Sequence, residues 1–323
     1  MKVYKSCVCG SGAVTFPHSE LERAPMSATV VNVIDIGTAN ARFGLAGEAF
    51  PSALVPSAGM AQGKVVNPAA LHKLVASHHG DRQHDAFVVD SVYADPLTFR
   101  RQWCEELMET IKVQGVAFAP SPVLSAFANA RTTALVVDMG AHGCVASAVV
   151  DGWLLRDSNV EISPVGGNAL DAFIKGKSKT DVAHIRTARE HADYKLPDGS
   201  EVADVLFSET PIPGLDHVPL HELAFTAGTR STSDDLRRAL LGSMVLCGGL
   251  SQTSHVAERL ADGVSRMARK DQPRVICANG KDRAVSAWLG GSIVASLAVY
   301  QEMRISQSEY SELGLNIVMS RDP

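Results

Sequence analysis

The chain has 323 residues, 46% of them hydrophobic and 20% charged, and its formal net charge is −5. This length exceeds the usual size of a single hydrophobic core and favours two domains. Proteins that bind nucleic acid directly carry clustered Lys and Arg, and this sequence has no such block, so we expect no direct DNA or RNA binding. The most apolar segment, residues 288–300, is shorter than the ~20 residues that span a bilayer, so we expect no membrane insertion.

Six Cys residues are scattered along the chain, which is more typical of free thiols in a reducing compartment than of a disulfide framework. Most lie in apolar stretches, where a Cys commonly acts as a small buried hydrophobe: Cys104, Cys144, Cys247 and Cys277. The other two lie in the first 25 residues, which have neither the apolar core of a signal peptide nor a helical period. We expect residues 1–26 to form a disordered extension, or to lie upstream of the start codon in use.

The first clear element is the stretch NVIDIGTANARFGLAGE, residues 32–48. An apolar run ends at Asp35, a turn of Gly37, Thr38 and Ala39 follows, and a second apolar run leads away. This pattern predicts a hairpin whose tip presents backbone N–H groups and one carboxylate.

Helices and strands then alternate. Asn67 as N-cap, Pro68 in the first turn and Gly80 as the stop predict a helix over residues 67–80. The pattern continues with a strand, a helix, a strand and a helix, at residues 85–93, 95–112, 115–120 and 121–130. Such alternation predicts an α/β sheet flanked by helices.

A second hairpin follows in ALVVDMGAHGCVASAVV, residues 134–150, with Asp138, Gly140 and Ala141 at its tip. It repeats the first hairpin after about one hundred residues, a spacing that indicates duplicated domains rather than a solenoid.

Beyond this hairpin, residues 175–232 are poorly patterned. A helix, a buried strand and a Gly-Gly turn follow in SDDLRRALLGSMVLCGGLS, and a further helix is expected from Thr253 or Ser254. A strand at RVICAN and an apolar helix around Trp288 complete the second half.

Two facing tips of this kind could clamp a polyphosphate between them. Because Asp35 and Asp138 would repel phosphate, we expect Mg²⁺ between them, held through water. Arg42, on the outgoing strand, could reach a phosphate, and Gly248 and Gly249 would permit close approach of a base or ribose. A single Asp-x-Gly is more often an ordinary β-turn, but two in matching contexts favour the binding interpretation.

Two other features have plain structural explanations. Asp234 and Asp235 are expected at a helix N-terminus, where they complement its dipole. Four histidines are expected at a solvated helix end rather than in a metal site, because no carboxylate or Cys completes the set: His72, His78, His79 and His84.

Several motifs resemble actin and actin-related proteins, and they occur in that family's order between about residues 30 and 318. VIDIGTANARFGLAGE and VVDMGAHGC resemble the two phosphate hairpins, VLCGGLSQTSHVAERL the adenosine motif, and VSAWLGGSIVASL the helix after it. YKLPDG and RISQSEYSELG are similar to an internal strand and the C-terminal tail. The shorter matches APSPVLSA, SPVGGNAL and FGLAGE are most similar to the pointed-end actin-related subunit of dynactin.

The resemblance implies the two-lobed, duplicated α/β ATPase fold that actin shares with Hsp70 and sugar kinases. Lobe I would comprise residues 27–128 and 286–323, and lobe II residues 129–285. ATP or ADP with Mg²⁺ would bind between the lobes. The implied binding residues are Asp35, Gly37, Thr38, Ala39, Arg42, Asp138, Gly140, Ala141, Gly248 and Gly249, with Asp35 and Asp138 holding the metal.

The sequence departs from the family at positions needed for hydrolysis. Ser121 replaces the Gln that orients the attacking water, Ala141 replaces an Asp, and Val145 replaces a His. Because hydrolysis depends on that orientation, efficient ATP turnover is not expected.

The base pocket departs as well: Thr253 replaces a Tyr, Ala284 a Lys, and Ala183 with His184 a Lys-Glu pair. Even the retained phosphate contacts change, because Arg42 replaces a Lys and Thr38 a Ser.

Both small family lobes are strongly reduced. Only about thirty residues separate FPS from DAFVVD, where the family inserts the lobe that grips the next filament subunit. A chain without that surface could join a filament by its other end but could not accept a subunit beyond itself.

These observations favour a poorly hydrolysing structural actin-related protein that is a subunit or pointed-end cap of a cytoplasmic, cytoskeletal complex such as dynactin. Its partners would be actin, actin-related subunits and complex-specific proteins. One alternative is a nuclear actin-related subunit of a chromatin-remodelling complex. The other is an active ATPase or phosphotransferase of the wider superfamily.

Overall fold

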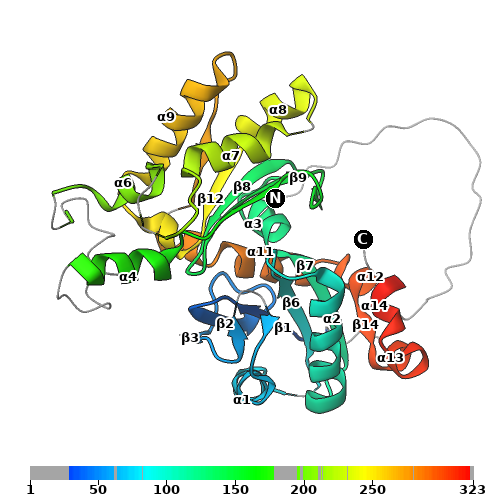
Figure 1. Cartoon of the computed structure of the whole chain (residues 1–323). Coiled ribbons are helices and arrows are strands. Elements are labelled where there is room, and N and C mark those ends of the chain that lie inside the picture. The colour runs from blue at the N-terminus through cyan, green and yellow to red at the C-terminus, as the bar shows by residue number, and fades with distance from the viewer. Residues whose placement is uncertain are drawn as a thin grey trace, which may run out of the picture.

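The computed structural model describes residues 29–61, 64–81, 83–177, 195–196, 199–209, 212, 214–230, 232–278 and 280–320. The expected N-terminal extension over residues 1–26 lies outside the described residues, as do Ala183 and His184. Two β-sheets form the centres of two halves of the molecule, with α3 (Ser121–Ala128) and α11 (Ser286–Ala295) lying between them (Figure 1).

The first sheet has six strands in the order β14-β7-β6-β1-β2-β3. They are β1 (Val31–Ile36), β2 (Asn40–Leu45), β3 (Ala53–Pro56), β6 (Asp85–Asp90), β7 (Gly115–Pro120) and β14 (Ile305–Ser306). Strand β1 is antiparallel to β2 and parallel to β6, so the predicted first hairpin is present at the centre of a mixed sheet. We call the half built on this sheet lobe I.

The helices of lobe I begin where the sequence predicts. In α1 (Pro68–His78) the Asn67 side chain accepts a hydrogen bond from the Ala70 amide at 3.1 Å, and in α2 (Pro96–Cys104) Asp95 caps in the same way. The helix expected over residues 95–112 changes hydrogen-bonding pattern, because α2 continues as a π-helix over Glu105–Ile111. Side-chain spacing alone does not report such a change.

The second sheet has the order β10-β9-β8-β12-β13, with β11 also paired to β9. Its strands are β8 (Ala134–Met139), β9 (Cys144–Val150), β10 (Trp153–Leu154), β11 (Val160–Ser163), β12 (Met244–Cys247) and β13 (Val275–Ile276). Strands β8 and β9 form the second predicted hairpin, and β12 lies parallel to β8. We call this half lobe II.

The helices of lobe II are α4 (Gly167–Lys177), α6 (Val202–Phe207), α7 (Leu220–Thr229), α8 (Asp234–Leu241), the 3-10 helix Gly249–Gln252, α9 (Val256–Ala268) and α10 (Gly280–Ala284). Of these, α7, α8 and α9 pack against strands of this sheet (Figure 1). Helix α9 starts at Val256, later than predicted. Helices α6 and α7 fall in the segment that the sequence left unassigned, where short apolar runs carry too little periodicity to be recognised.

Helix α11 packs against the sheet of lobe I and against α3. Trp288 is fully buried and its indole Nε1 donates a hydrogen bond to the Val33 carbonyl of β1 at 3.1 Å. A Cβ at Gly290 would overlap the Leu124 carbonyl of α3, so this glycine permits the two helices to touch backbone to backbone. The apolar segment around residue 288 is therefore a buried helix, as expected, and no described helix is long and apolar enough to cross a membrane.

The C-terminal segment is fixed to lobe I by a buried ion pair. Arg304 Nε donates to Asp85 Oδ2 at 2.5 Å, and the Tyr300 hydroxyl donates to the same oxygen at 2.9 Å. Tyr300 begins helix α12 (Tyr300–Met303), and helices α13 (Gln307–Leu313) and α14 (Asn316–Ser320) follow Arg304.

Several smaller expectations can also be checked. Asp234 and Asp235 do begin a helix, capped by Ser233, and Cys104, Cys144 and Cys247 are buried. The expectation for Cys277 is wrong: it is exposed, because it follows a two-residue edge strand.

The histidine cluster is also not uniformly solvated. His79 is only 1% exposed, because it packs at the end of α1 beneath β1, where Asn32 reaches the His78 and His79 carbonyls. His72 contacts Glu106 at 2.7 Å. Among the residues described, no group of three or more His, Cys, Asp or Glu could hold a metal ion.

Candidate functional site

A cavity of about 560 Å³ opens between the two lobes, within the size range of small-molecule sites. All ten residues that the sequence pattern indicated line it: Asp35, Gly37, Thr38, Ala39, Arg42, Asp138, Gly140, Ala141, Gly248 and Gly249. The two hairpin tips and the end of β12 thus converge on one space, although the tips lie about one hundred residues apart in sequence.

The first tip is shaped by Ser57, which follows β3. Gly37 closes the turn by donating to the Asn40 carbonyl at 3.0 Å. The Ser57 amide donates to the Ala39 carbonyl at 3.0 Å, and its hydroxyl donates to the Gly37 carbonyl. The Gly37 and Ala39 carbonyls are therefore occupied, whereas no backbone carbonyl in the described part of the chain accepts from the Thr38 and Ala39 amides. Such amides suit an anion.

The second tip has the same construction, with the start of α4 in the role of Ser57. Gly140 donates to the Gly143 carbonyl at 2.9 Å. The amides of Gly167 and Asn168 donate to the carbonyls of Gly140 and Ala141 at 3.0 and 2.8 Å. The first two residues of α4, Gly167 and Asn168, thus orient the tip.

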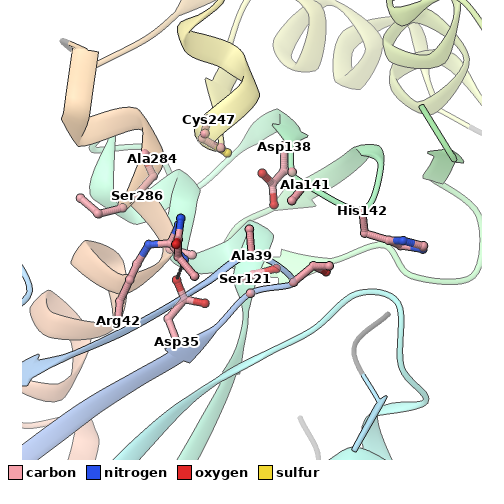
Figure 2. A pocket seen from close by; sticks show the side chains of 18 of the residues that line it. Asp35, Ala39, Arg42, Ser121, Asp138, Ala141, His142, Cys247, Ala284 and Ser286 are labelled. Carbon is pink, nitrogen blue, oxygen red and sulfur yellow. Dashed lines mark hydrogen bonds and ion pairs between the residues drawn. The ribbon is translucent and has the colours of Figure 1, made fainter. Parts of the chain in front are cut away.

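Asp35 and Arg42 form an ion pair inside the cavity. They are direct cross-strand partners in the first hairpin, and Arg42 Nη1 lies 2.9 Å from Asp35 Oδ2. Both side chains are 14% exposed. Figure 2 shows this pair on the lobe I side, with Asp138 and Ala141 on the lobe II side.

Asp138 sits where β8 ends, against Gly248. Burial raises the pKa of the Asp138 carboxyl to about 6, with a smaller contribution from the charge of Asp35, while Arg42 acts in the opposite direction. Gly248 has φ of +89°, and a Cβ there would overlap the Asp138 carboxylate. Only glycine fits this approach of β12 to β8.

The positions where the sequence departs from the actin pattern have small side chains in the structure. Ser121 begins α3 and lines the cavity (Figure 2). Val145 is buried within β9 and does not line the cavity. Ala284 lines the cavity. In the turn after β12, Gln252 lines the cavity and Thr253 does not. No described side chain at these positions replaces the missing water-orienting groups.

The structure also adds residues that the sequence did not single out. Tyr93, in the loop after β6, and His142, on the second tip, lie edge to face with ring centroids 5.1 Å apart. Lys281 and Arg283 of α10 bring two cations to the wall near Gly248. In the sequence, the basic residues of KDRAVSAW, shortly before Trp288, could have indicated that this segment brings positive charge to the cavity.

Two carboxylates complete the wall, Asp90 at the end of β6 and Asp171 in α4, both almost fully buried. Asp90 is paired with Arg100 at 2.7 Å. Neither carries a local motif, so only the fold brings them to the cavity.

Comparison with known proteins agrees with this geometry. The Actin family model matches residues 59–187 and 177–323. Proteins named Actin-related protein 4 from Oryza sativa subsp. indica and subsp. japonica are each 27% identical over 303 aligned positions, which cover 69% of this chain and 68% of the relative. The chain belongs to the actin family and is similar to its actin-related proteins.

Members of this family generally bind a nucleotide with a divalent metal, and the cavity fits the nucleotide in three respects. It has sufficient volume, and at the first tip it presents the Thr38 and Ala39 amides, for which backbone acceptors are lacking among the described residues. It also has Gly248 at the close approach of β12 to β8. For the metal it offers the Asp138 carboxylate and an Asp35 carboxylate already shared with Arg42.

Proposed function

We propose that this protein is a structural, poorly hydrolysing actin-related subunit that caps the pointed end of a cytoplasmic, cytoskeletal assembly of the dynactin type. The observation that carries the proposal is the reduced lobe after β3. Where the family inserts a subunit-gripping lobe, the described residues form only a hairpin of β4 (Met60–Ala61) and β5 (Lys64–Val65), followed by α1.

The neighbouring sheet edge supports the same proposal. The Ser57 amide bonds to the carbonyl of Ala39, the residue before β2, so by antiparallel alternation the backbone groups of Leu54 and Pro56 in β3 face away from the sheet. Pro56 has no N–H, and a proline at this place blocks addition of another strand. This end of lobe I is thus poorly suited to accepting a further subunit through its sheet edge.

A nucleotide would act mainly as a structural ligand between the lobes. The tip amides of Thr38 and Ala39 and the Arg42 guanidinium would hold phosphate oxygens, and Asp138 would hold Mg²⁺ through water. A bound Mg²⁺ would neutralise phosphate charge. Because Ser121 and Ala141 offer no group long enough to orient a water, the cavity would retain the nucleotide with little turnover.

The test is a native pull-down of the tagged protein from its own cells, with partners identified by mass spectrometry. Recovery of an actin-related filament with pointed-end companion proteins is expected. Recovery of chromatin-remodelling subunits would support the nuclear alternative and overturn the cap. A tagged variant with Trp288→Ala, which removes the buried contact between α11 and β1, serves as the misfolded control.

Turnover by the purified protein is the second measurement. We expect ATP hydrolysis at least about 100-fold slower than that of filament-forming actin, because the water-orienting groups are missing. Comparable turnover, or phosphorylation of a panel of sugars, would support the enzymatic alternative instead.

A further inference from the structure

The cavity between the lobes contains two carboxylates near the place where the tips would hold phosphate, and such a site needs positive charge. We propose that Arg42 is a resident cation of this cavity, so that the protein binds a nucleoside polyphosphate without requiring a divalent ion. This inference rests on the proposed nucleotide site and specifies the chemistry of that site.

The position of Arg42 is set by the fold. Strand β2 is held between β1 and β3, and its register places Arg42 directly opposite Asp35. Side chains of directly opposed residues lie on the same face of a sheet, so the pair is fixed by the hairpin itself. A Cβ at Gly37 would lie 3.5 Å from Arg42 Nη1, so the guanidinium passes beneath the first tip.

The guanidinium has donors left after it pairs with Asp35. It carries five N–H groups in one plane, and a single Nη1 contact holds the carboxylate. Its Nε is buried and has no partner within the described chain. A Lys ammonium at this place would be a single point charge largely consumed by Asp35, whereas Arg can bind a carboxylate and a phosphate together.

Among the residues described, the negative and positive charges at the rest of the cavity are also balanced. Four carboxylates line the cavity: Asp35, Asp90, Asp138 and Asp171. Against them stand Arg42, Lys281 and Arg283 in the wall and Arg100 behind it, on Asp90. Three of these cations lie in the wall, and with Arg100 behind it they equal the carboxylates in number, so the cavity can accept a polyanion before any metal arrives.

The first test uses the protein without nucleotide and compares melting temperatures in EDTA and in millimolar Mg²⁺. For the wild type we expect a difference below about 1 °C, because Arg42 already neutralises Asp35. For Arg42→Gln we expect Mg²⁺ to raise the melting temperature by about 3 °C or more, because Asp35 and Asp138 are then left to share a cation. A wild type stabilised by Mg²⁺, or an Arg42→Gln variant indifferent to it, would overturn the proposal.

The second test measures binding of ATP and ADP by calorimetry, again in EDTA and in Mg²⁺. Wild-type affinity should change less than about 3-fold on removal of Mg²⁺, whereas Arg42→Lys, which keeps the charge and the fold, should lose at least about 10-fold. Equal metal dependence in the two proteins contradicts the role of Arg42. If neither nucleotide binds in any condition, the polyphosphate part fails, while the pull-down still decides the capping function.

Discussion

Tyr93 and His142 pack edge to face across the rim of the cavity, with ring centroids 5.1 Å apart. Tyr93 belongs to lobe I and His142 to the tip of the second hairpin in lobe II, so this contact joins the two lobes. Arg156 of lobe II lies nearby, with Nη1 3.5 Å from the Ala94 carbonyl. The loop between β6 and α2 therefore contributes to the contact between the two lobes.

A double-mutant cycle tests this contact. Tyr93→Ala and His142→Ala should each lower stability, and the pair should show a coupling of about 1 kcal/mol, as expected for an aromatic edge contact. Chemical denaturation of the four proteins measures the coupling. Strictly additive effects would show that the two rings do not stabilise one another.

Gly248 should be irreplaceable, whereas its neighbour Gly249 should not. Gly248→Ala places a Cβ on the Asp138 carboxylate in a backbone conformation of φ +89°, so we expect a loss of at least about 2 kcal/mol together with nucleotide affinity. Gly249→Ala meets nothing within 4 Å and should cost less than about 0.5 kcal/mol. Thermal melting of both variants measures these losses. Equal losses would contradict the close approach of Gly248 to Asp138.

Much of the cavity could be predicted from the sequence because its parts are local. An Asp followed by small residues between two apolar runs specifies a hairpin tip, and Gly248 marks the end of a buried strand. The Asn67 and Asp95 caps were equally local, because each side chain bonds to an amide three residues along. The internal repeat of this hairpin was sufficient to predict that the two tips face one another.

The remainder depends on contacts between distant segments. Nothing near Tyr93 indicates that it meets His142, and Asp171 reaches the wall only because α4 packs beside the second tip. The π-helical continuation of α2 keeps the apolar spacing of an α-helix and so leaves no sequence signal. His79 looked solvated because the tertiary partner that buries it, β1, lies far away in sequence.

The buried pair of Asp85 and Arg304 should anchor the C-terminal segment strongly. Arg304→Met leaves the Asp85 carboxylate, which is 0% exposed, without its charge partner, and we expect a loss of about 3–5 kcal/mol. Tyr300→Phe removes one donor and should cost about 1–3 kcal/mol. Arg238→Met is the matched control, because its pair with Asp235 is exposed and is worth at most about 1 kcal/mol. Urea denaturation measures all three, and a loss at Arg304 no larger than that at Arg238 would contradict the anchor.

Acid stability of lobe II should depend on Glu201, which lies before α6. Its carboxylate accepts hydrogen bonds from Lys195 Nζ at 2.7 Å and from Arg259 Nη2 at 2.8 Å. The hydrogen bond from Lys195, followed by His255 and the charges of Lys195 and Arg259, lowers the Glu201 pKa from its ordinary value of 4.5 to about 2.

Between these two values the unfolded chain binds a proton that the folded chain does not, so stability rises with pH through this window. The contribution of Glu201 is therefore complete above about pH 4.5 and is lost as the pH falls toward 2. Glu201→Gln should flatten this part of the stability profile, and Lys195→Met should move the Glu201 pKa back toward 4.5. Carbon-13 NMR titration of the side-chain carboxyl reports the value directly. A midpoint near 4.5 in the wild type would mean that the ion pairs between α6 and α9 do not form in solution.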